Sequence, residues 1–374
     1  MWNNTKLTEL LGIEYPVLQG PFGGGLSTVD LVGIVSNAGG LGGYGAYTMA
    51  PEEIFDVNRR IKCVTDKPYN LNLWVSDTDL VDGTVSDELY NQTARIFEPY
   101  FDEAGIDLPG KPAPFHSRFE NQVQVILDVS PAVFSFMFGI PSAAILDECR
   151  KKGIKTAGAA TTLDEAVKLE AAGVDMIIAS GFEAGGHRPS FLAPAEQSTT
   201  GTFVLLQLIR ERVKIPVIAA GGIANGRGIA AALLLGADAA QVGTAFLACD
   251  ESGALPIHRN MLFTAAAKYT TLSRAFTGRL GRGISTRIAR DLKGKEDQFL
   301  PFPLQTRFIS SLRTAALEQE KWDLILFWCG QITPILKHRS AAVLMQSLLD
   351  EASDIMDSGV KDKGFRTIHE KNKT

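Results

Sequence analysis

Short apolar runs recur along roughly the first 250 residues of the chain. Each run ends in glycine or another small residue and is followed by a segment whose apolar residues recur at helical spacing. Nearly continuous apolar strands that alternate with amphipathic helices are typical of a parallel sheet covered by helices. The eight predicted strands are residues 14–19, 41–46, 69–75, 132–137, 154–158, 174–179, 216–220 and 239–242.

Eight strand–helix units in about 250 residues are the expected size of a (β/α)8 TIM barrel. The predicted helices include residues 51–63, which begin with proline, and an earlier helix that Ser27 or Thr28 caps. A doubly wound open sheet has the same alternation, so the alternation alone leaves that alternative open. The glycine-rich loops described below favour the barrel, and we therefore expect an α/β fold of that kind.

Two segments fall outside the repeat. Residues 76–116, after the third strand, are longer and more polar than a simple loop, and predict an insertion over the barrel mouth. The repeat stops near residue 254, so we expect the barrel to occupy residues 1–254. Residues 255–374 are less regular, with helices predicted near 308–320 and 340–356. We expect this part to form a mostly helical C-terminal lid or substrate subdomain.

Composition excludes several classes of protein. Of the 374 residues, 45% are hydrophobic and 21% charged, which is typical of a globular protein with a large core. The net charge is −5 and the basic residues are scattered, which argues against nucleic acid as a partner. No apolar stretch is long enough to span a membrane, and no signal peptide is evident. We expect a cytoplasmic protein, a monomer or homodimer.

The cysteines are widely spaced, without the short pairs of a disulfide framework or a zinc site. No other residues have the spacing of metal ligands, and we expect no metal. The sequence therefore predicts reduced thiols in the core at Cys63, Cys149, Cys249 and Cys329.

Two glycine-rich loops follow the seventh and eighth predicted strands, where (β/α)8 barrels often bind phosphate. Gly221 and Gly222 lie after the first of these strands, and Gly243 and Thr244 after the second. Glycine lets the backbone approach an anion closely, and free N–H groups at the start of the next helix complement its charge. The two loops predict a phosphate clamp, with simple tight turns as the alternative.

One histidine, His187, lies among small residues in the loop after the sixth strand. The ordinary pKa of histidine is near 6.5, so this side chain can accept a proton at neutral pH. The alternative is a surface histidine beside a flexible loop. The other histidines have no comparable setting, and we expect no function of His116, His258, His338 and His369.

Residues 40–45 read GLGGYG and match the letters of the GxGxxG motif. They lie between a helix end and a strand, whereas a dinucleotide-binding fingerprint follows a strand and opens a helix. We therefore expect these glycines to have no role in dinucleotide binding. The Walker lysine motif, HExxH and GxSxG are also absent from the sequence.

Six further patterns follow one another along most of the chain: PVLQGPFGGGLST (16–28), SNAGGLGGYGA (36–46), GFEAGGHR (181–188), IPVIAAGGIANGRGIAAALLLGADAAQVGTAFL (215–247), FTGRLGRGI (276–284) and FWCGQ (327–331). Together they resemble the nitronate monooxygenases, formerly called 2-nitropropane dioxygenases, and more distantly the flavin-dependent enoyl-ACP reductases. The pair EAGGHR and AAGGI…QVGTAF is a specific signal, whereas any single glycine motif is weak.

The resemblance implies a barrel that holds FMN without covalent linkage, with a smaller domain closing over the flavin. His187 falls on the catalytic histidine of the family. The residues implied beside the flavin ring are Gly20, Pro21, Phe22, Asn72, Ser180, Gly181, Gly185 and Gly186. Those implied at the phosphate, together with Gly221 from the loop pattern, are Gly222, Gln241, Val242, Gly243 and Thr244.

Some positions depart from the family pattern. Phe22 stands where methionine is common, Ser180 where glutamine is common, and Met137 where members that react with nitronates often have a second histidine. Residues 301–305 lack the tyrosines expected there. Fewer polar groups predict a pocket that is less selective for a charged nitro group.

The expected function is FMN-dependent oxidation of small alkyl nitronates by O2 to a carbonyl compound and nitrite. Where a neutral nitroalkane is accepted, His187 acts as general base. One alternative is an NAD(P)H-dependent flavin reductase acting on a quinone or an enoyl thioester. A lyase or isomerase of sugar phosphates on a flavin-free barrel, and a non-catalytic ligand-binding protein, are further alternatives.

Overall fold

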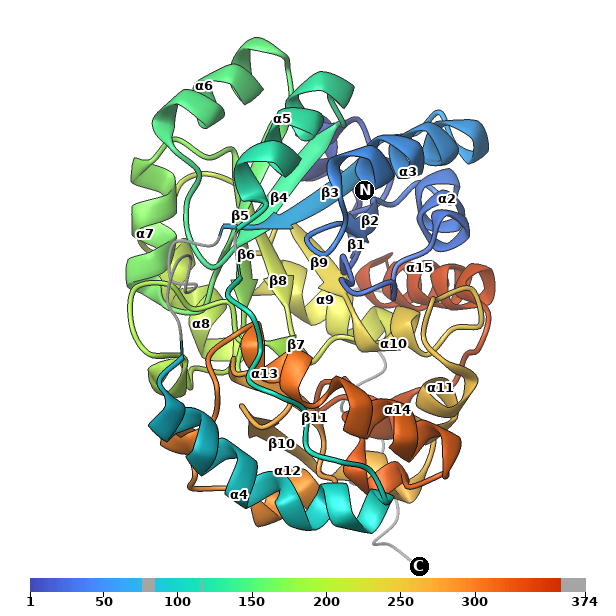
Figure 1. Cartoon of the computed structure of the whole chain (residues 1–374). Helices are drawn as coiled ribbons and strands as arrows, with labels where there is room; N and C mark the ends of the chain where they lie inside the picture. The colour runs from blue at the N-terminus through green and yellow to red at the C-terminus, as the bar shows by residue number, and fades with distance from the viewer. Residues whose placement is uncertain (76–84, 116, 358–374) are drawn as a thin grey trace, which may run out of the picture.

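The computed structural model in Figure 1 describes residues 1–75, 85–115 and 117–357. Part of the predicted insertion, together with His116 and His369, lies outside these residues. Eight parallel strands pair in the order β1-β9-β8-β6-β5-β4-β3-β2. Their bounds are β1 Val17–Gln19, β2 Gly42–Gly45, β3 Tyr69–Trp74, β4 Val133–Met137, β5 Lys155–Ala160, β6 Met176–Ser180, β8 Val217–Ala220 and β9 Ala239–Val242.

The strands at the two ends of this order, β1 and β2, meet and complete the barrel. The backbone N–H of Gln19 donates to the carbonyl of Leu41 (2.9 Å), and the N–H of Leu41 donates to the carbonyl of Val17 (3.0 Å). These bonds join the ends of the sheet, as a barrel requires. The predicted (β/α)8 barrel is therefore confirmed, and the doubly wound sheet is excluded.

Helices surround the barrel in the positions that the sequence predicts (Figure 1). Thr28 caps the first of them, because its Oγ1 accepts a hydrogen bond from Leu31 N (3.0 Å). A short helix, α1 (Lys6–Leu11), packs against the barrel interior through Leu7 and Leu11. The surrounding helices are α2 Val29–Asn37, α3 Pro51–Val64, α5 Phe119–Val129, α6 Ala143–Lys151, α7 Leu163–Ala171, α8 Thr202–Arg210 and α9 Gly226–Leu234.

The last described helix, α15 (Ala341–Asp357), also packs on the barrel, against α9 and α2. Leu344 and Leu348 are buried in the barrel core. Gly226 permits this close packing, because a Cβ there would lie 2.3 Å from the backbone nitrogen of Ala352. The sequence pattern predicts this helix as part of the C-terminal subdomain, whereas in the structure it contacts barrel helices.

A second hydrophobic core lies beside the mouth of the barrel. It unites α4 (Asp87–Ala104), from the predicted insertion, with helices of the C-terminal part. Phe97 and Phe101 of α4 pack against Phe308, with ring centroids 5.7 and 5.6 Å away. In Figure 1 these helices form a layer below the barrel. Those that follow the barrel are α10 Thr244–Leu247, α11 Pro256–Met261, α12 Arg287–Asp291, α13 Leu304–Phe308 and α14 Ser310–Glu318.

A small antiparallel sheet connects the barrel to this second core. Its strands are β10 (Thr270–Ser273), β11 (Gly281–Ile284) and the two-residue β7 (Gly186–His187), in the order β10-β11-β7. Because β7 belongs to the loop after β6, this sheet ties a barrel loop to the C-terminal part of the chain (Figure 1). Within the described residues, the helices are too short or too polar to cross a membrane.

The packing of α15 on the barrel predicts a large effect of removing Leu348. Its side chain is 1% exposed, and Leu348→Ala should lower the free energy of unfolding by about 2–5 kcal/mol. Val343 on the same helix is 54% exposed, so Val343→Ala should change it by less than about 0.5 kcal/mol. Denaturant unfolding measures both, and equal effects would contradict this packing.

Candidate active site

A cavity of about 580 Å³ lies at the carboxyl ends of the barrel strands, between the barrel and the second core. Ligand sites of (β/α)8 barrels lie at this end of the strands. Most of the predicted site residues line the cavity: Gly20, Pro21, Phe22, Asn72, Ser180, Gly185, Gly186, His187, Gly221, Gly222, Gln241, Gly243 and Thr244.

Two predicted residues, Gly181 and Val242, do not line the cavity but support it from behind. Gly181 lies against the start of α8, where a Cβ would be 2.5 Å from the backbone nitrogen of Thr202. Val242 is fully buried, and its carbonyl accepts a hydrogen bond from the N–H of Gly20 (2.9 Å). This bond fixes the backbone where the chain leaves β1.

Backbone N–H groups gather at one end of the cavity, after β8 and β9. Gly221 and Gly222 have φ of +106° and +73°, conformations that favour glycine. Gly243 precedes α10, and Thr244 begins it. Within the described residues, the N–H groups of Gly222, Gly243 and Thr244 donate no hydrogen bond to protein. Because these N–H groups line the cavity without a protein acceptor, they are suited to an anion.

A carboxylate also lies near these amides, but its charge is held elsewhere. Glu183 lines the cavity, and its Oε2 accepts hydrogen bonds from the N–H (2.8 Å) and the hydroxyl (2.9 Å) of Thr202. Thr202 is the first residue of α8, so the helix N-terminus stabilises this negative charge. The amides after β8 and β9 therefore remain available to a second anion.

Asn72 presents a polar atom to the cavity from the end of β3. Its Nδ2 donates to Ser135 Oγ (2.9 Å), whereas its Oδ1 is buried and has no hydrogen-bond partner. A buried acceptor without a partner is unfavourable unless a ligand supplies the donor. Asn72 Oδ1 is therefore suited to accept a hydrogen bond from a bound molecule.

The segment after β1 forms another wall of the cavity and is rigidly held. Ser27 Oγ accepts a hydrogen bond from Phe22 N (2.9 Å) and donates one to the carbonyl of Gly43 (3.0 Å). Gln19 Oε1 accepts from Gly43 N (2.9 Å). These hydrogen bonds fix the backbone of Gly20, Pro21 and Phe22.

His187 lines the same cavity, and its backbone pairs with Gly281 of β11. Its Nε2 lies 2.8 Å from Thr277 Oγ1. Aromatic rings surround the imidazole: the ring centroids of Trp328 and Trp74 are 4.7 and 5.1 Å from its own. Phe302 completes the group at 6.1 Å. The histidine is thus held in an apolar setting with one ring nitrogen bonded.

The charge state of His187 follows from this setting. Burial, together with the positive charge of Arg279, lowers the pKa of His187 to about 3. The guanidinium of Arg279 lies over the rings of Phe138 and Phe302, at 3.8 and 4.7 Å from their centroids. The imidazole is therefore neutral at physiological pH, and it accepts a proton only where a nearby negative charge stabilises the cation.

Comparisons with known proteins agree with this arrangement. A family model described as nitronate monooxygenase matches residues 4–351. A probable nitronate monooxygenase of Staphylococcus aureus (strain Newman) is 35% identical over 357 residues, which cover 95% of this chain and 99% of the relative. The chain belongs to the nitronate monooxygenase family. It is accordingly a flavin-dependent oxidoreductase, as the sequence patterns predicted.

Solved structures support membership of the nitronate monooxygenase family. The structure of a nitroalkane oxidase from Streptomyces ansochromogenes has a TM-score of 0.85 and 32% sequence identity, covering 94% of this chain and 99% of that one. The structure of FabK from Thermotoga maritima has a TM-score of 0.73 and 27% identity, covering 95% and 98%. The barrel and the C-terminal part thus recur together in these relatives.

Positions that depart from the nitronate monooxygenase pattern also lie at the cavity. Phe22, Ser180 and Met137 line it, and Met137 places an apolar side chain where members that react with nitronates often have a histidine. Met137 packs against the group formed by Trp74, Phe138 and Phe302. Phe302 belongs to residues 301–305, which lack the expected tyrosines, so this segment contributes a phenylalanine ring to the group.

Sequence reasoning missed several residues around His187. Trp74 lies at the end of the third strand, and side chains at that position of a barrel reach the cavity. Its position in the sequence could therefore have indicated a role at the site. Thr277 lies in the segment FTGRLGRGI, but no pattern indicated its role. Trp328 and Phe302 come from irregular segments far along the chain. His258 also lines the cavity, and its Nε2 donates to the carbonyl of Trp328 (3.0 Å).

Other predictions concern the glycines of β2 and the cysteines. In β2 the glycines permit close packing: a Cβ at Gly45 would lie 2.5 Å from the backbone of Phe22.

Cys149, Cys249 and Cys329 are buried and free, as predicted, but Cys63 is exposed and the prediction of a core thiol there is wrong. Among the described residues, no three His, Cys, Asp or Glu side chains are grouped to hold a metal ion.

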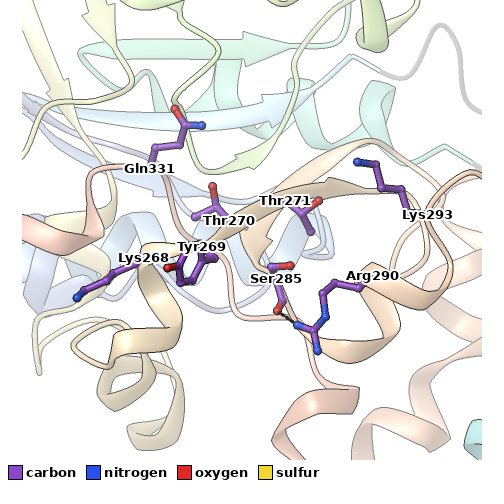
Figure 2. Close-up of a pocket in the computed structure, with 8 residues that line it drawn as sticks. All are labelled: Lys268, Tyr269, Thr270, Thr271, Ser285, Arg290, Lys293 and Gln331. Atoms are coloured by element: carbon purple, nitrogen blue, oxygen red, sulfur yellow. Dashed lines mark hydrogen bonds between the residues drawn. The ribbon is translucent and has the colours of Figure 1, made fainter.

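A second hollow, of about 520 Å³, lies beside β10 (Figure 2). It shares no lining residue with the cavity that contains His187. Arg290 donates a hydrogen bond to the backbone carbonyl of Ser285 at its edge (Figure 2). Lysines and hydroxyl groups form the rest of its wall, and no predicted site residue is among them: Lys268, Tyr269, Thr270, Thr271, Lys293 and Gln331.

The lowered pKa of His187 predicts that its imidazole does not titrate between pH 8 and pH 5. A neutral ring stays neutral until the pH falls toward the pKa, which lies well below this range. NMR of protein labelled with ¹⁵N-histidine measures this directly, and the signal is assigned by its loss in His187→Asn. A midpoint near 6.5, the ordinary value for histidine, would contradict the setting described here.

Proposed function

We propose that this member of the nitronate monooxygenase family binds FMN in the cavity and oxidises small alkyl nitronates with O2. The products are a carbonyl compound and nitrite, a conversion that takes one oxygen atom from O2 for each nitronate. The observation that carries the proposal is that unpaired amides and a neutral histidine line one cavity.

The loops after β8 and β9 would hold the FMN phosphate. The N–H groups of Gly222, Gly243 and Thr244 are without protein partners in the described part of the chain, and phosphate oxygens are the acceptors they fit. The absence of Cβ atoms at the two glycines lets the phosphate approach the backbone. A phosphomonoester is therefore a better fit than a neutral ligand.

The ring system of FMN would lie along the wall formed by Gly20, Pro21 and Phe22. Asn72 Oδ1, which lacks a donor in the protein, would accept a hydrogen bond from the N–H of the flavin ring. Ser180, Gly185 and the other small residues after β6 leave room for a planar group. When bound, the flavin accepts electrons from the substrate and passes them to oxygen.

The protein's part in the reaction is to position the substrate and to hold a proton. His187 is neutral, so with a neutral nitroalkane it can take the α-proton, which leaves the nitronate. The negative charge of that nitronate then stabilises the imidazolium beside it. The rings of Trp74, Trp328 and Phe302 make the surroundings of the imidazole apolar.

The apolar walls of the cavity favour an alkyl substrate. The cavity extends past His187 toward the second core, where Leu247, Phe276 and Leu326 line it. Apolar side chains attract alkyl groups. Arg313 lines the same cavity and offers a partner to a carboxylate. We therefore infer that simple alkyl nitronates are substrates and that a nitronate with a carboxylate is also accommodated.

Adding a methyl group at Gly243 should block FMN without unfolding the protein. The nearest protein atom to an added Cβ is Phe22 Cε1, 3.9 Å away, so the methyl group would occupy space left for the ligand. We expect Gly243→Ala to weaken FMN binding by about tenfold or more, measured by flavin fluorescence. Gly110→Ala, where an added Cβ meets nothing, is the matched control. Unchanged affinity of Gly243→Ala would exclude the phosphate from this loop.

Replacing His187 should lower the turnover of substrate without affecting the binding of FMN. His187→Asn should retain FMN and lose about 100-fold or more of kcat/KM for nitroethane, because the base contributes on that order. The loss of kcat/KM for ethylnitronate should be smaller, since the α-proton is already absent from this substrate. Turnover of nitroethane at the wild-type rate would remove His187 from the mechanism.

The assay that tests the function compares three reagents with FMN-loaded protein under air. Ethylnitronate and propionate 3-nitronate should both be consumed with oxygen uptake and nitrite release. NADH should not bleach the flavin. Rapid bleaching by NADH, without nitrite release from either nitronate, would instead establish the reductase alternative.

A further inference from the structure

The hydroxyl of Thr277 takes part in three hydrogen bonds. Its Oγ1 lies 2.8 Å from His187 Nε2, 3.1 Å from the carbonyl oxygen of Arg279 and 3.3 Å from the backbone nitrogen of Arg279. Thr277 is 9% exposed and lines the cavity. Its segment lies between β10 and β11, which places it beside the strand that pairs with His187.

The direction of each bond follows from counting hydrogens. A hydroxyl has one proton to donate and two lone pairs with which to accept. The carbonyl of Arg279 can only accept, so the Thr277 proton is donated to it. The backbone N–H of Arg279 can only donate, so it occupies one lone pair. The remaining lone pair is left for His187, and the hydrogen of that bond must come from Nε2.

We propose that Thr277 is a positioning residue that holds His187 as the Nε2–H tautomer, so that Nδ1 is the atom that accepts the substrate proton. This inference rests on the proposed role of His187 as base. A neutral imidazole carries a proton on one nitrogen only, and the partner of that nitrogen decides which atom is left as the base.

The other ring nitrogen is free for this task. Within the described part of the chain, His187 Nδ1 forms no hydrogen bond, and it is not among the fully buried atoms that lack one. The backbone of His187 is fixed by the pairing of β7 with β11, and Arg188 N donates to the carbonyl of Leu280 (2.9 Å). The ring is therefore held by its backbone and by Nε2, which leaves Nδ1 toward the cavity.

The proton transfer is balanced in this arrangement. The α-carbon–hydrogen bond of the nitroalkane breaks, its electron pair moves into the nitro group, and a new N–H bond forms at Nδ1. The imidazole becomes a cation and the substrate an anion, so no other reagent is needed. Thr277 Oγ1 accepts from Nε2–H before and after the transfer, and it stabilises the cation because Nε2–H then becomes a stronger donor.

The tautomer can be measured without any assay of activity. In full-length protein labelled with ¹⁵N-histidine, the two ring nitrogens of a neutral imidazole have well-separated shifts, and the one that carries hydrogen is identified directly. We expect a proton on Nε2 of His187 in the wild-type protein and in Thr277→Ser. In Thr277→Val, which has no hydroxyl, the signal should move toward the other tautomer or an average of both.

Kinetics supply a second readout that distinguishes positioning from general stability. Thr277→Val should lower kcat/KM for nitroethane by about tenfold or more, because the imidazole loses the acceptor that orients it and stabilises its cation, and a fraction of the enzyme carries the proton on the wrong nitrogen. With ethylnitronate, which has no proton to remove, it should remain within about threefold of wild type. Thr277→Ser should restore the nitroethane rate, and Thr271→Val, outside the cavity, is the matched control.

Two results would overturn the inference: a proton on Nδ1 in the wild-type protein, or an unchanged tautomer and nitroethane rate in Thr277→Val. An equal loss of activity toward nitroethane and ethylnitronate in a folded Thr277→Val variant would also count against the inference. Failure of the proposed function is recognised separately, because the wild-type protein would then oxidise neither substrate while the tautomer measurement still gives its result.

Discussion

Backbone hydrogen bonds between β7 and β11 join the loop after the sixth barrel strand to the C-terminal part of the chain, and the position of His187 depends on them. Two buried guanidinium groups also hold the loop after β6. Arg188 donates to the carbonyl of Gly181 (2.6 Å), and Arg282 donates to that of Phe182 (2.9 Å). Since charged donors to buried carbonyls are costly to lose, these bonds stabilise the conformation of the loop. The barrel alone would leave this histidine on a flexible loop.

The two parts of the protein contribute different properties to one cavity. The barrel supplies backbone amides at the carboxyl ends of its strands, where an anion can bind without a cationic side chain. The C-terminal part supplies Thr277, Phe302 and Trp328, which make the surroundings of the imidazole apolar and fix its orientation. A cation is disfavoured in such surroundings until an anion lies beside it, so the charge of His187 is coupled to the charge of the substrate.

Much of this arrangement could be predicted from the sequence, because the barrel depends on local patterns. Strands with continuous apolar residues, and glycines where the backbone must turn sharply, are enough to identify the loops at Gly222 and Gly243. The packing of α15 on the barrel could not be predicted, since an amphipathic helix does not encode its partner. Thr277 and Trp328 were missed for a related reason: long-range pairing through β11 brings them to His187, and neither lies in a periodic segment.

We propose that backbone amides after β8 and β9 bind the phosphate of FMN and present its ring to His187. The most direct test is to titrate flavin-free protein with FMN and with riboflavin, which has the same ring and no phosphate. The account predicts one FMN per chain, bound at least about a hundredfold more tightly than riboflavin, because several charge-assisted hydrogen bonds are lost with the phosphate. Equal affinity for the two flavins, or no binding of either, would contradict it.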